Sequence, residues 1–135
     1  MRVNSLLTLV SLTLCSGCAG RLISNAQEVS LGRGVDAEIR KEYRLVSPKD
    51  PVAQWAKSLV VPLARASNEF RPLGEIGGYK VAVIADDDLV NAFAAPGGFT
   101  YVTTGLILRT DTCAEIAGVM GHELAHITQR HSAKA

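Results

Sequence analysis

The stretch "TCAEIAGVMGHELAHITQRHSA", residues 112–133, decides the architecture expected of this chain. Thr112 and Glu115 have the spacing of a capping box, in which two side chains satisfy backbone N–H groups at the start of a helix. The pattern predicts a helix from Cys113 to about Ser132. The faces of that helix follow from its periodicity of about 100° per residue.

Two histidines and a glutamate on this helix form a His-Glu-x-x-His motif. His122 and His126 are about 40° apart and one turn apart along the helix, so both imidazoles can bind one ion. Glu123 is about 60° from His126, where it can contact a water on that ion but not easily bind the ion itself. This arrangement is typical of a zinc metallopeptidase, in which the glutamate accepts a proton from water. The alternative is an amphipathic helix with two incidental histidines.

The other residues of the helix divide into two faces. An apolar stripe, with the two histidines at its edge, contains Ile116, Val119, Met120, Leu124 and Ile127. A second face contains only small residues, which are Ala114, Ala117, Gly118, Gly121 and Ala125. A glycine costs a helix about 1 kcal/mol, so we expect this face to pack closely against a neighbouring element. Elements missing beyond residue 135 would leave Ile116, Met120 and Ile127 at risk of exposure.

A catalytic zinc site needs a third protein ligand, and the residues themselves do not identify it. If the helix continues, His131 points about 140° away from His126 and is more simply a packed or solvated histidine. Glu115 lies two turns from His122, about 10 Å along the axis, so its capping role suffices. The run Asp86, Asp87 and Asp88 is expected to be a solvated turn.

The rest of the chain predicts an α+β fold. Apolar spacing predicts a helix around 35–43, and Asp50-Pro51 is a start signal for a second helix that ends near Asn68. The strands of a small antiparallel sheet are expected in "YKVAVIADD" (79–87), Val90–Ala95 and Phe99–Val102, the last two forming a hairpin around Pro96-Gly97-Gly98. A short helical turn is expected at 105–109.

The first residues have the plan of a secretory signal: Arg2, an apolar run from Leu6 to Leu14, then small residues. Their end resembles a bacterial lipobox, so we expect a lipoprotein signal peptide at 1–17, lipidation of Cys18, a tether over 18–34 and the domain over 35–135. An ordinary cleaved signal peptide is the alternative. Cys113 would then be the one remaining thiol, and we expect it to be buried.

Charge and composition exclude some functions. Lysine and arginine number 14 against 13 acidic residues, a formal net charge of +1. There is no basic excess and no interleaving of aromatic and basic residues, so we expect no nucleic-acid partner.

Two segments together, "VNAFAAPGGFTYVTTGLI" (90–107) and "AEIAGVMGHELAHITQRHSA" (114–133), resemble zinc metallopeptidases of the BepA, HtpX and CAAX-prenyl-protease type, and most closely the envelope lipoproteins among them. The resemblance implies that His122 and His126 bind Zn²⁺ and that Glu123 is the base. It also implies that the third ligand is a glutamate on a later helix, beyond Ala135. Residues Asn91, Ala92, Phe93 and Ala94 match the strand to which an extended substrate adds.

The resemblance implies a zinc-dependent metalloendopeptidase of the bacterial cell envelope. Its substrates would be misfolded or misassembled polypeptides in extended form, and its location the periplasmic side of the outer membrane, through a lipid anchor. Two alternatives remain: a catalytically incomplete, lipid-anchored binding or chaperone-like module, and a gene remnant without function.

Overall fold

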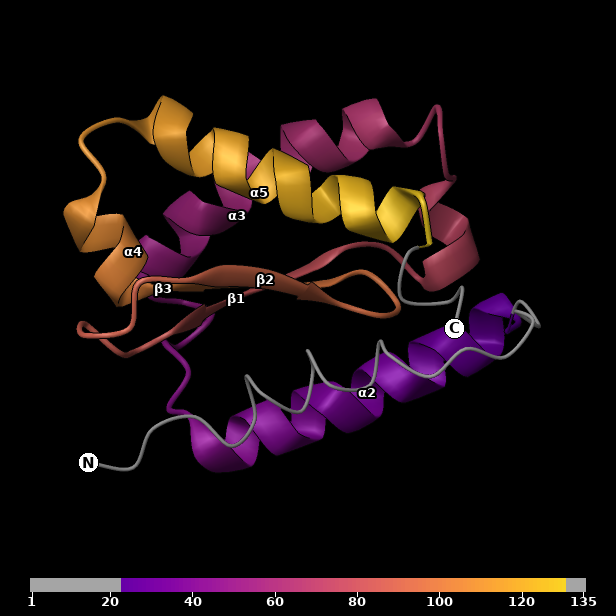
Figure 1. Ribbon diagram of the computed structural model, residues 1–135, viewed down its shortest axis with the longest axis horizontal. Helices are drawn as coiled ribbons and strands as arrows, with labels where there is room; N and C mark the ends of the chain where they lie inside the picture. Colours follow the sequence, from indigo (N-terminus) through magenta and orange to yellow (C-terminus); the bar gives the residue numbers. More distant parts are fainter. Residues whose placement is uncertain (1–22, 131–135) are drawn as a thin grey trace, which may run out of the picture.

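The computed structural model describes residues 23–130, which form three stacked layers (Figure 1). Helix α2 (Asn25–Glu42) covers one face of a sheet, and helices α3 (Pro51–Ser67) and α5 (Cys113–Thr128) cover the other. The sheet contains β1 (Lys80–Ile84), β2 (Ala92–Ala95) and β3 (Phe99–Thr103); the short helices η1 (Leu73–Ile76) and α4 (Thr104–Arg109) complete the described part. This architecture confirms the expected α+β class.

Side chains at the helix starts account for where α3 and α5 begin. Asp50 caps α3 by accepting a hydrogen bond from the Val52 N–H, as its position before Pro51 predicted. Thr112 caps α5 by accepting from the Glu115 N–H at 3.3 Å. The Glu115 carboxylate accepts in turn from the Asp111 N–H, which confirms a capping role for Glu115.

The segment expected as a tether is largely helical. Helix α2 begins at Asn25, not after Gly34, and it starts with a capping box between Ser24 and Gln27. Polar composition and three glycines suggested a linker, although the Ser-x-x-Gln spacing was a local signal of the helix. Gly32 is needed for packing, because a Cβ there would lie 1.8 Å from the Pro96 carbonyl oxygen.

The sheet is mixed rather than antiparallel. Its strand order is β1-β3-β2, with β2 antiparallel to β3 and β1 parallel to β3. The hairpin between β2 and β3 formed as predicted. The chain leaving β1 passes to the far edge before it returns, so β3 enters between the other two strands and runs parallel to β1. The edge of β1 is partly covered by an antiparallel bridge from Leu45 to Ile84.

Alternation along the strands produces two hydrophobic cores, one on each face of the sheet. Val83 and Val102 face α3 and α5, where they pack in a buried cluster with Met120 and Leu124. The neighbouring residues Ile84 and Tyr101 face α2 and pack with Ile39. The larger core therefore lies directly beneath the motif helix.

Helix α5 differs from the expectation in its length and at one position of its apolar stripe. It ends at Thr128 rather than near Ser132, and Arg130 takes a left-handed conformation with φ 54°. Ile116, Met120 and Ile127 are buried, so the expectation that they risk exposure is wrong. Val119 does not belong to the buried stripe, because it is 36% exposed.

The small-residue face of α5 does not pack closely in the part of the chain that the structure describes. A Cβ added at Gly118 or Gly121 would have no neighbour within 4 Å. Cys113 is exposed, so the expectation of a buried thiol is also wrong. Its position as the first residue of α5 explains this, because the stripe that faces the core starts at Ile116.

The predicted signal peptide, Cys18 and His131 lie outside the described residues. Within residues 23–130, no helix combines the length and the apolar character that a membrane crossing requires.

Candidate metal site

The two motif histidines lie on the side of α5 that points away from the sheet. Leu124 is buried in the core, and at about 100° per residue His122 and His126 are each about 160° from it. Accordingly, His122 is exposed and His126 is half-buried. Glu123, about 100° from Leu124, is half-buried between these two faces. His126, which is about 100° from the buried Ile127 around the helix, thus lies at the edge of the apolar stripe as predicted, and the exposed His122 lies further from the core.

The two imidazoles are placed to share an ion. Their Nε2 atoms are 3.1 Å apart, the ring centroids are 4.7 Å apart and the ring planes are nearly perpendicular, at 88°. Nitrogen ligands about 2.05 Å from a tetrahedral zinc are about 3.3 Å from each other. The observed separation is close to that value, so His122 and His126 fit a zinc ion through their Nε2 atoms.

The described residues do not complete such a site. Within 23–130, no group of three or more histidine, cysteine, aspartate or glutamate side chains is close enough to hold a metal. Glu123 remains on the flank of the histidine pair, and Glu115 is occupied at the helix start. The two histidines are therefore the metal ligands that this part of the chain can provide.

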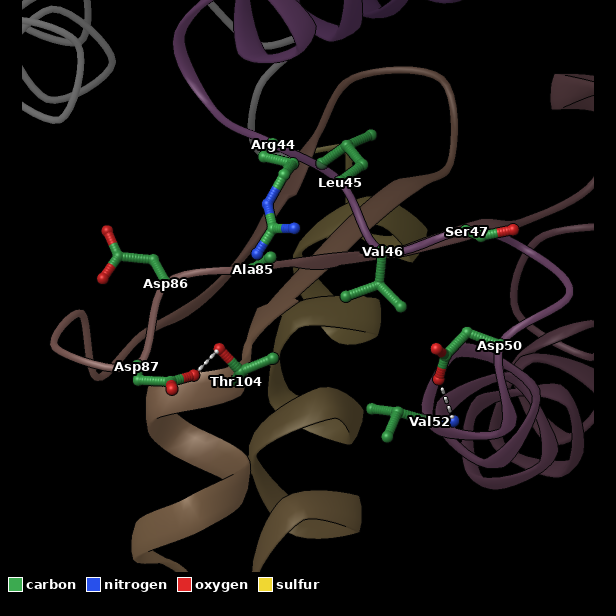
Figure 2. A pocket seen from close by; sticks show the side chains of 10 residues that line it. All are labelled: Arg44, Leu45, Val46, Ser47, Asp50, Val52, Ala85, Asp86, Asp87 and Thr104. Carbon is green, nitrogen blue, oxygen red and sulfur yellow. Dashed lines mark hydrogen bonds between the residues drawn. The ribbon is translucent and has the colours of Figure 1, made fainter.

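The acidic run after β1 forms a turn, as expected. The Asp86 carboxylate accepts hydrogen bonds from the N–H groups of Asp88 and Leu89, and Asp87 accepts from the Thr104 hydroxyl at 2.6 Å. Asp86 and Asp87 line a pocket of about 590 Å³ together with Arg44 (Figure 2). No motif residue lines this pocket, which separates it from the histidine pair.

The strand predicted to bind substrate lies at the edge of the sheet, beside α5. Asn91 exchanges hydrogen bonds with Thr103 on the β3 side, so alternation directs the N–H and C=O groups of Ala92 and Ala94 towards the free edge. The Ala92 and Ala94 side chains pack against the core that contains α5, whereas Phe93 stacks on Tyr101 on the opposite face. Small side chains at 92 and 94 allow the helix to approach this strand closely.

Sequence reasoning missed a buried ionic cluster at the end of α5. Glu28 and Arg71 are only 2% and 3% exposed, and Arg130 contacts Glu28. No local pattern marks these residues, since Glu28 and Arg71 are 43 positions apart. The available sequence signal is weak, because the capping box indicates only that Glu28 belongs to a helix and not that it is buried.

Comparison with known proteins places these features in a family. The sequence model of the family described as Peptidase family M48 matches residues 52–135, which include α3, the sheet and α5.

The chain is similar to longer proteins. It is 30% identical over 118 residues to the "Beta-barrel assembly-enhancing protease" of Escherichia coli, a match covering 87% of this chain and 23% of that protein. It is also 30% identical over 118 residues to the "Mitochondrial metalloendopeptidase OMA1" of Arabidopsis thaliana, covering 79% and 24% respectively. With the human metalloendopeptidase OMA1 it shares 24% identity over 90 residues, covering 67% and 17%. The chain thus spans about a quarter or less of the length of these relatives.

Proposed function

The chain belongs to peptidase family M48, and we propose on that premise that it contributes the metal-binding helix and a substrate strand to a zinc-dependent metalloendopeptidase. The observation that carries this proposal is the 3.1 Å separation of the His122 and His126 Nε2 atoms. In the proposed enzyme these two residues hold the zinc ion. A glutamate downstream of residue 135 supplies the third ligand, by the resemblance described above.

The chain's own residues have separate tasks in this mechanism. Zinc, when bound, polarises a peptide carbonyl and lowers the pKa of water. Glu123 accepts a proton from the attacking water at its carboxylate and later donates it to the leaving amine. Its half-buried place on the flank of the histidine pair supports this role, because it lies beside both ligands without being one of them.

The substrate is proposed to be an extended polypeptide that adds to β2. Strand β2 is at the edge of the sheet, and the backbone groups of Ala92 and Ala94 point outward, where a peptide strand can pair with them. Asn91 and Phe93 hold the strand in place through Thr103 and Tyr101. A peptide bound there lies next to α5, which packs on β2.

Location and physiological substrates form a separate part of the proposal. The signal-like residues 1–17 and the lipobox-like "CSGC" support a lipid anchor at Cys18 on the periplasmic side of a bacterial envelope membrane, most simply the outer membrane. The name of the Escherichia coli relative refers to β-barrel assembly, which supports misassembled envelope proteins as substrates. Replacing Cys18 by Ser should release the protein from the membrane fraction; unchanged partitioning would contradict the anchor.

The catalytic assignment is tested by comparing two kinds of substitution in a full-length version of the protein. Glu123→Gln should keep zinc and lose proteolysis, because it removes a proton acceptor and not a ligand. His126→Ala should lose both. Glu115→Gln, which changes another glutamate of α5, is the matched control and should keep zinc and activity. Loss of zinc in Glu123→Gln would contradict its role as a base.

A second function is favoured by the two-ligand site within the described residues. In this reading the protein is a lipid-anchored module that binds extended segments at β2 without cutting them. Zinc titration and a digestion assay on a full-length version of the protein separate the two, because only the enzyme would digest a substrate there. The same measurements on the chain of residues 19–135 test whether the third ligand lies outside them. Weak zinc binding without proteolysis is expected of this chain, because two histidines alone leave positions of the ion to water. Tight one-to-one binding with chelator-sensitive proteolysis would mean that a third ligand lies within these residues.

A further inference from the structure

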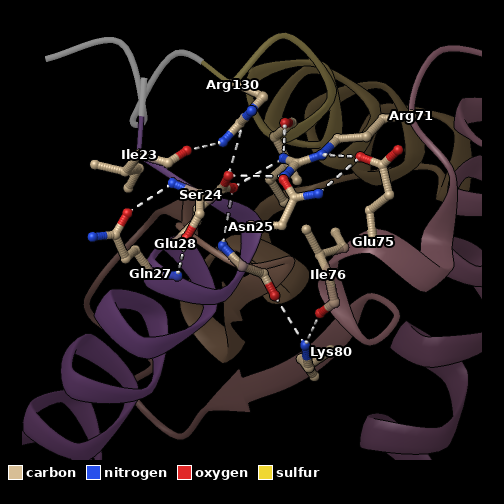
Figure 3. Close-up of polar contacts among 12 residues, drawn as sticks. Ile23, Ser24, Asn25, Gln27, Glu28, Arg71, Glu75, Ile76, Lys80 and Arg130 are labelled. Atoms are coloured by element: carbon tan, nitrogen blue, oxygen red, sulfur yellow. Dashed lines mark hydrogen bonds and ion pairs between the residues drawn. The ribbon is translucent and has the colours of Figure 1, made fainter. Parts of the chain in front are cut away.

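A buried ion pair connects α2 to the segment before the sheet. Arg71 donates two hydrogen bonds to the Glu28 carboxylate, from Nη1 at 2.9 Å and from Nη2 at 2.8 Å, and Nη2 also donates to Asn25 (Figure 3). Burial acts to raise the pKa of Glu28, but hydrogen bonds from Arg71 and Gly97 and the positive charges of Arg71 and Arg130 lower it overall. Glu28 is therefore a buried carboxylate in its charged form.

The same pair contacts the end of the motif helix and the turn of the substrate hairpin. Arg71 Nη1 donates at 2.9 Å to the carbonyl oxygen of Ile127, the residue after His126. Glu28 Oε1 accepts at 3.3 Å from the N–H of Gly97, in the turn between β2 and β3. One ion pair thus joins main-chain atoms of the two elements that carry the proposed ligands and the proposed substrate strand.

Arg71 adds a side-chain donor at the end of α5, where the Ile127 carbonyl also accepts from the Arg130 N–H at 3.1 Å. Carbonyl groups of the last helical turn have no helical partner, and a guanidinium at that end is favourable both as a donor and as a charge. Arg130 adopts the left-handed conformation there, which is unfavourable for residues other than glycine, asparagine and aspartate. Its side chain donates to Glu28 and to the Ile23 carbonyl, so the cluster also holds this strained residue.

We propose that Glu28 and Arg71 are positioning residues that fix the last turn of α5, and with it His126, relative to the β2–β3 hairpin. This inference rests on the proposed function, since it concerns the geometry of the same site. Stability alone does not require the pair, because replacing a buried ion pair by apolar residues is often neutral or stabilising. What apolar residues cannot do is bond the Ile127 carbonyl and the Gly97 N–H at once.

The test separates positioning from stability. In the full chain, Glu28 and Arg71 are both replaced by Met, and a second variant carries Arg71→Lys. Lysine keeps the positive charge, but its single ammonium group replaces the planar guanidinium that donates to several acceptors at once. Three quantities are measured for each: the thermal unfolding midpoint, the Zn²⁺ affinity by calorimetric titration, and hydrogen exchange of the amides at 97–98 and 125–129.

Two controls calibrate these measurements. Replacing Glu38 and Lys41 by Met removes an exposed ion pair on the same helix, with 2.6 Å between Nζ and Oε1, and should change none of the three quantities. Ile39→Ala opens the core on the other side of the sheet, so it should lower the unfolding midpoint and leave Zn²⁺ affinity unchanged.

We expect both test variants to bind Zn²⁺ about tenfold more weakly, as is found when residues supporting metal ligands are removed, and to lose exchange protection at 125–129. Folded variants with wild-type affinity and protection would overturn the proposal, as would an affinity loss equally large in Ile39→Ala. If the double variant does not fold, the Zn²⁺ affinity and the exchange protection of Arg71→Lys decide between these outcomes. If His122→Ala binds Zn²⁺ as wild type does, the proposed function fails, while the exchange data still decide whether the pair positions the helix end.

Discussion

Gly32 allows α2 to pack against the hairpin, and Gly32→Ala tests that packing. The added Cβ would lie 1.8 Å from the Pro96 carbonyl oxygen, 2.8 Å from its carbon and 2.9 Å from a Phe99 ring carbon. Since such contacts essentially never fall below about 3.0 Å, helix and turn must separate by roughly 1.2 Å. The nearest atom, the Pro96 carbonyl oxygen, belongs to the backbone and cannot rotate away as the end of a side chain can.

The expected loss of stability follows from two opposing contributions. Overpacking of this kind costs up to about 3 kcal/mol, and alanine recovers about 1 kcal/mol of helix propensity. The net loss is therefore about 2 kcal/mol. With a urea dependence of about 1.5 kcal/mol per molar, the unfolding midpoint should fall by about 1.3 M.

A neighbouring glycine provides the control. Gly34 lies in the same helix, and a Cβ there meets nothing within 4 Å. Gly34→Ala should therefore gain helix propensity without a clash and raise the free energy of unfolding by up to about 1 kcal/mol. Urea unfolding followed by circular dichroism measures both variants. A midpoint for Gly32→Ala equal to or above that of the wild type would refute the close contact between α2 and the hairpin.

Four further predictions concern single groups. Thr103→Val should cost about 2 kcal/mol of stability, because the N–H groups of Asn91 and Leu106 both donate to the buried Thr103 hydroxyl and would lose this partner. Thr103→Ser keeps the hydroxyl and should retain most of that stability. Tyr101→Phe should lower stability by about 1 kcal/mol, since its hydroxyl donates to Asp36 at 2.7 Å, and chemical unfolding would detect the change. The pKa of Glu28 is lowered in the folded state, so its contribution to stability is present above about pH 4.5 and is lost as pH falls through the folded pKa. Acid unfolding of the wild type and of Glu28→Gln should therefore differ in that range. Identical pH profiles of the two proteins would count against a charged Glu28. Cys113 should react with a thiol reagent in the native protein without prior denaturation, because it is exposed. Reaction only after denaturation would contradict that exposure.

Local patterns in the sequence were sufficient for several elements. Asp50-Pro51 marked the start of α3, Thr112 marked the start of α5, and Pro96-Gly97-Gly98 marked the hairpin turn. Each signal acts within about four residues, where a side chain satisfies a backbone group or a glycine adopts a positive φ. The pairing of His122 with His126 is of the same kind, since helical periodicity alone brings i and i+4 together.

The capping box of α2 is also a signal within four residues, but the polar, glycine-containing composition of residues 18–34 led to their interpretation as a tether. Ser24 and Gln27 show the helix start, and the glycines that suggested a linker serve different purposes. Gly32 lies against the hairpin, whereas Gly34 has open space beside it. Nothing near either glycine in sequence distinguishes them, because the obstacle at Gly32 is the carbonyl of Pro96, far along the chain.

Tertiary structure alone decided the rest. The parallel pairing of β1 with β3 depends on which strand enters the middle of the sheet, and strand propensity does not specify this. The face of α5 that is buried was set by the sheet and α3, which cover Ile116 and leave Val119 exposed. The ion pair of Glu28 with Arg71 depends on two segments being brought together, since neither charge would be buried without the other. A local pattern records bonds within a few residues, whereas these features arise from contacts that exist only once the chain has folded.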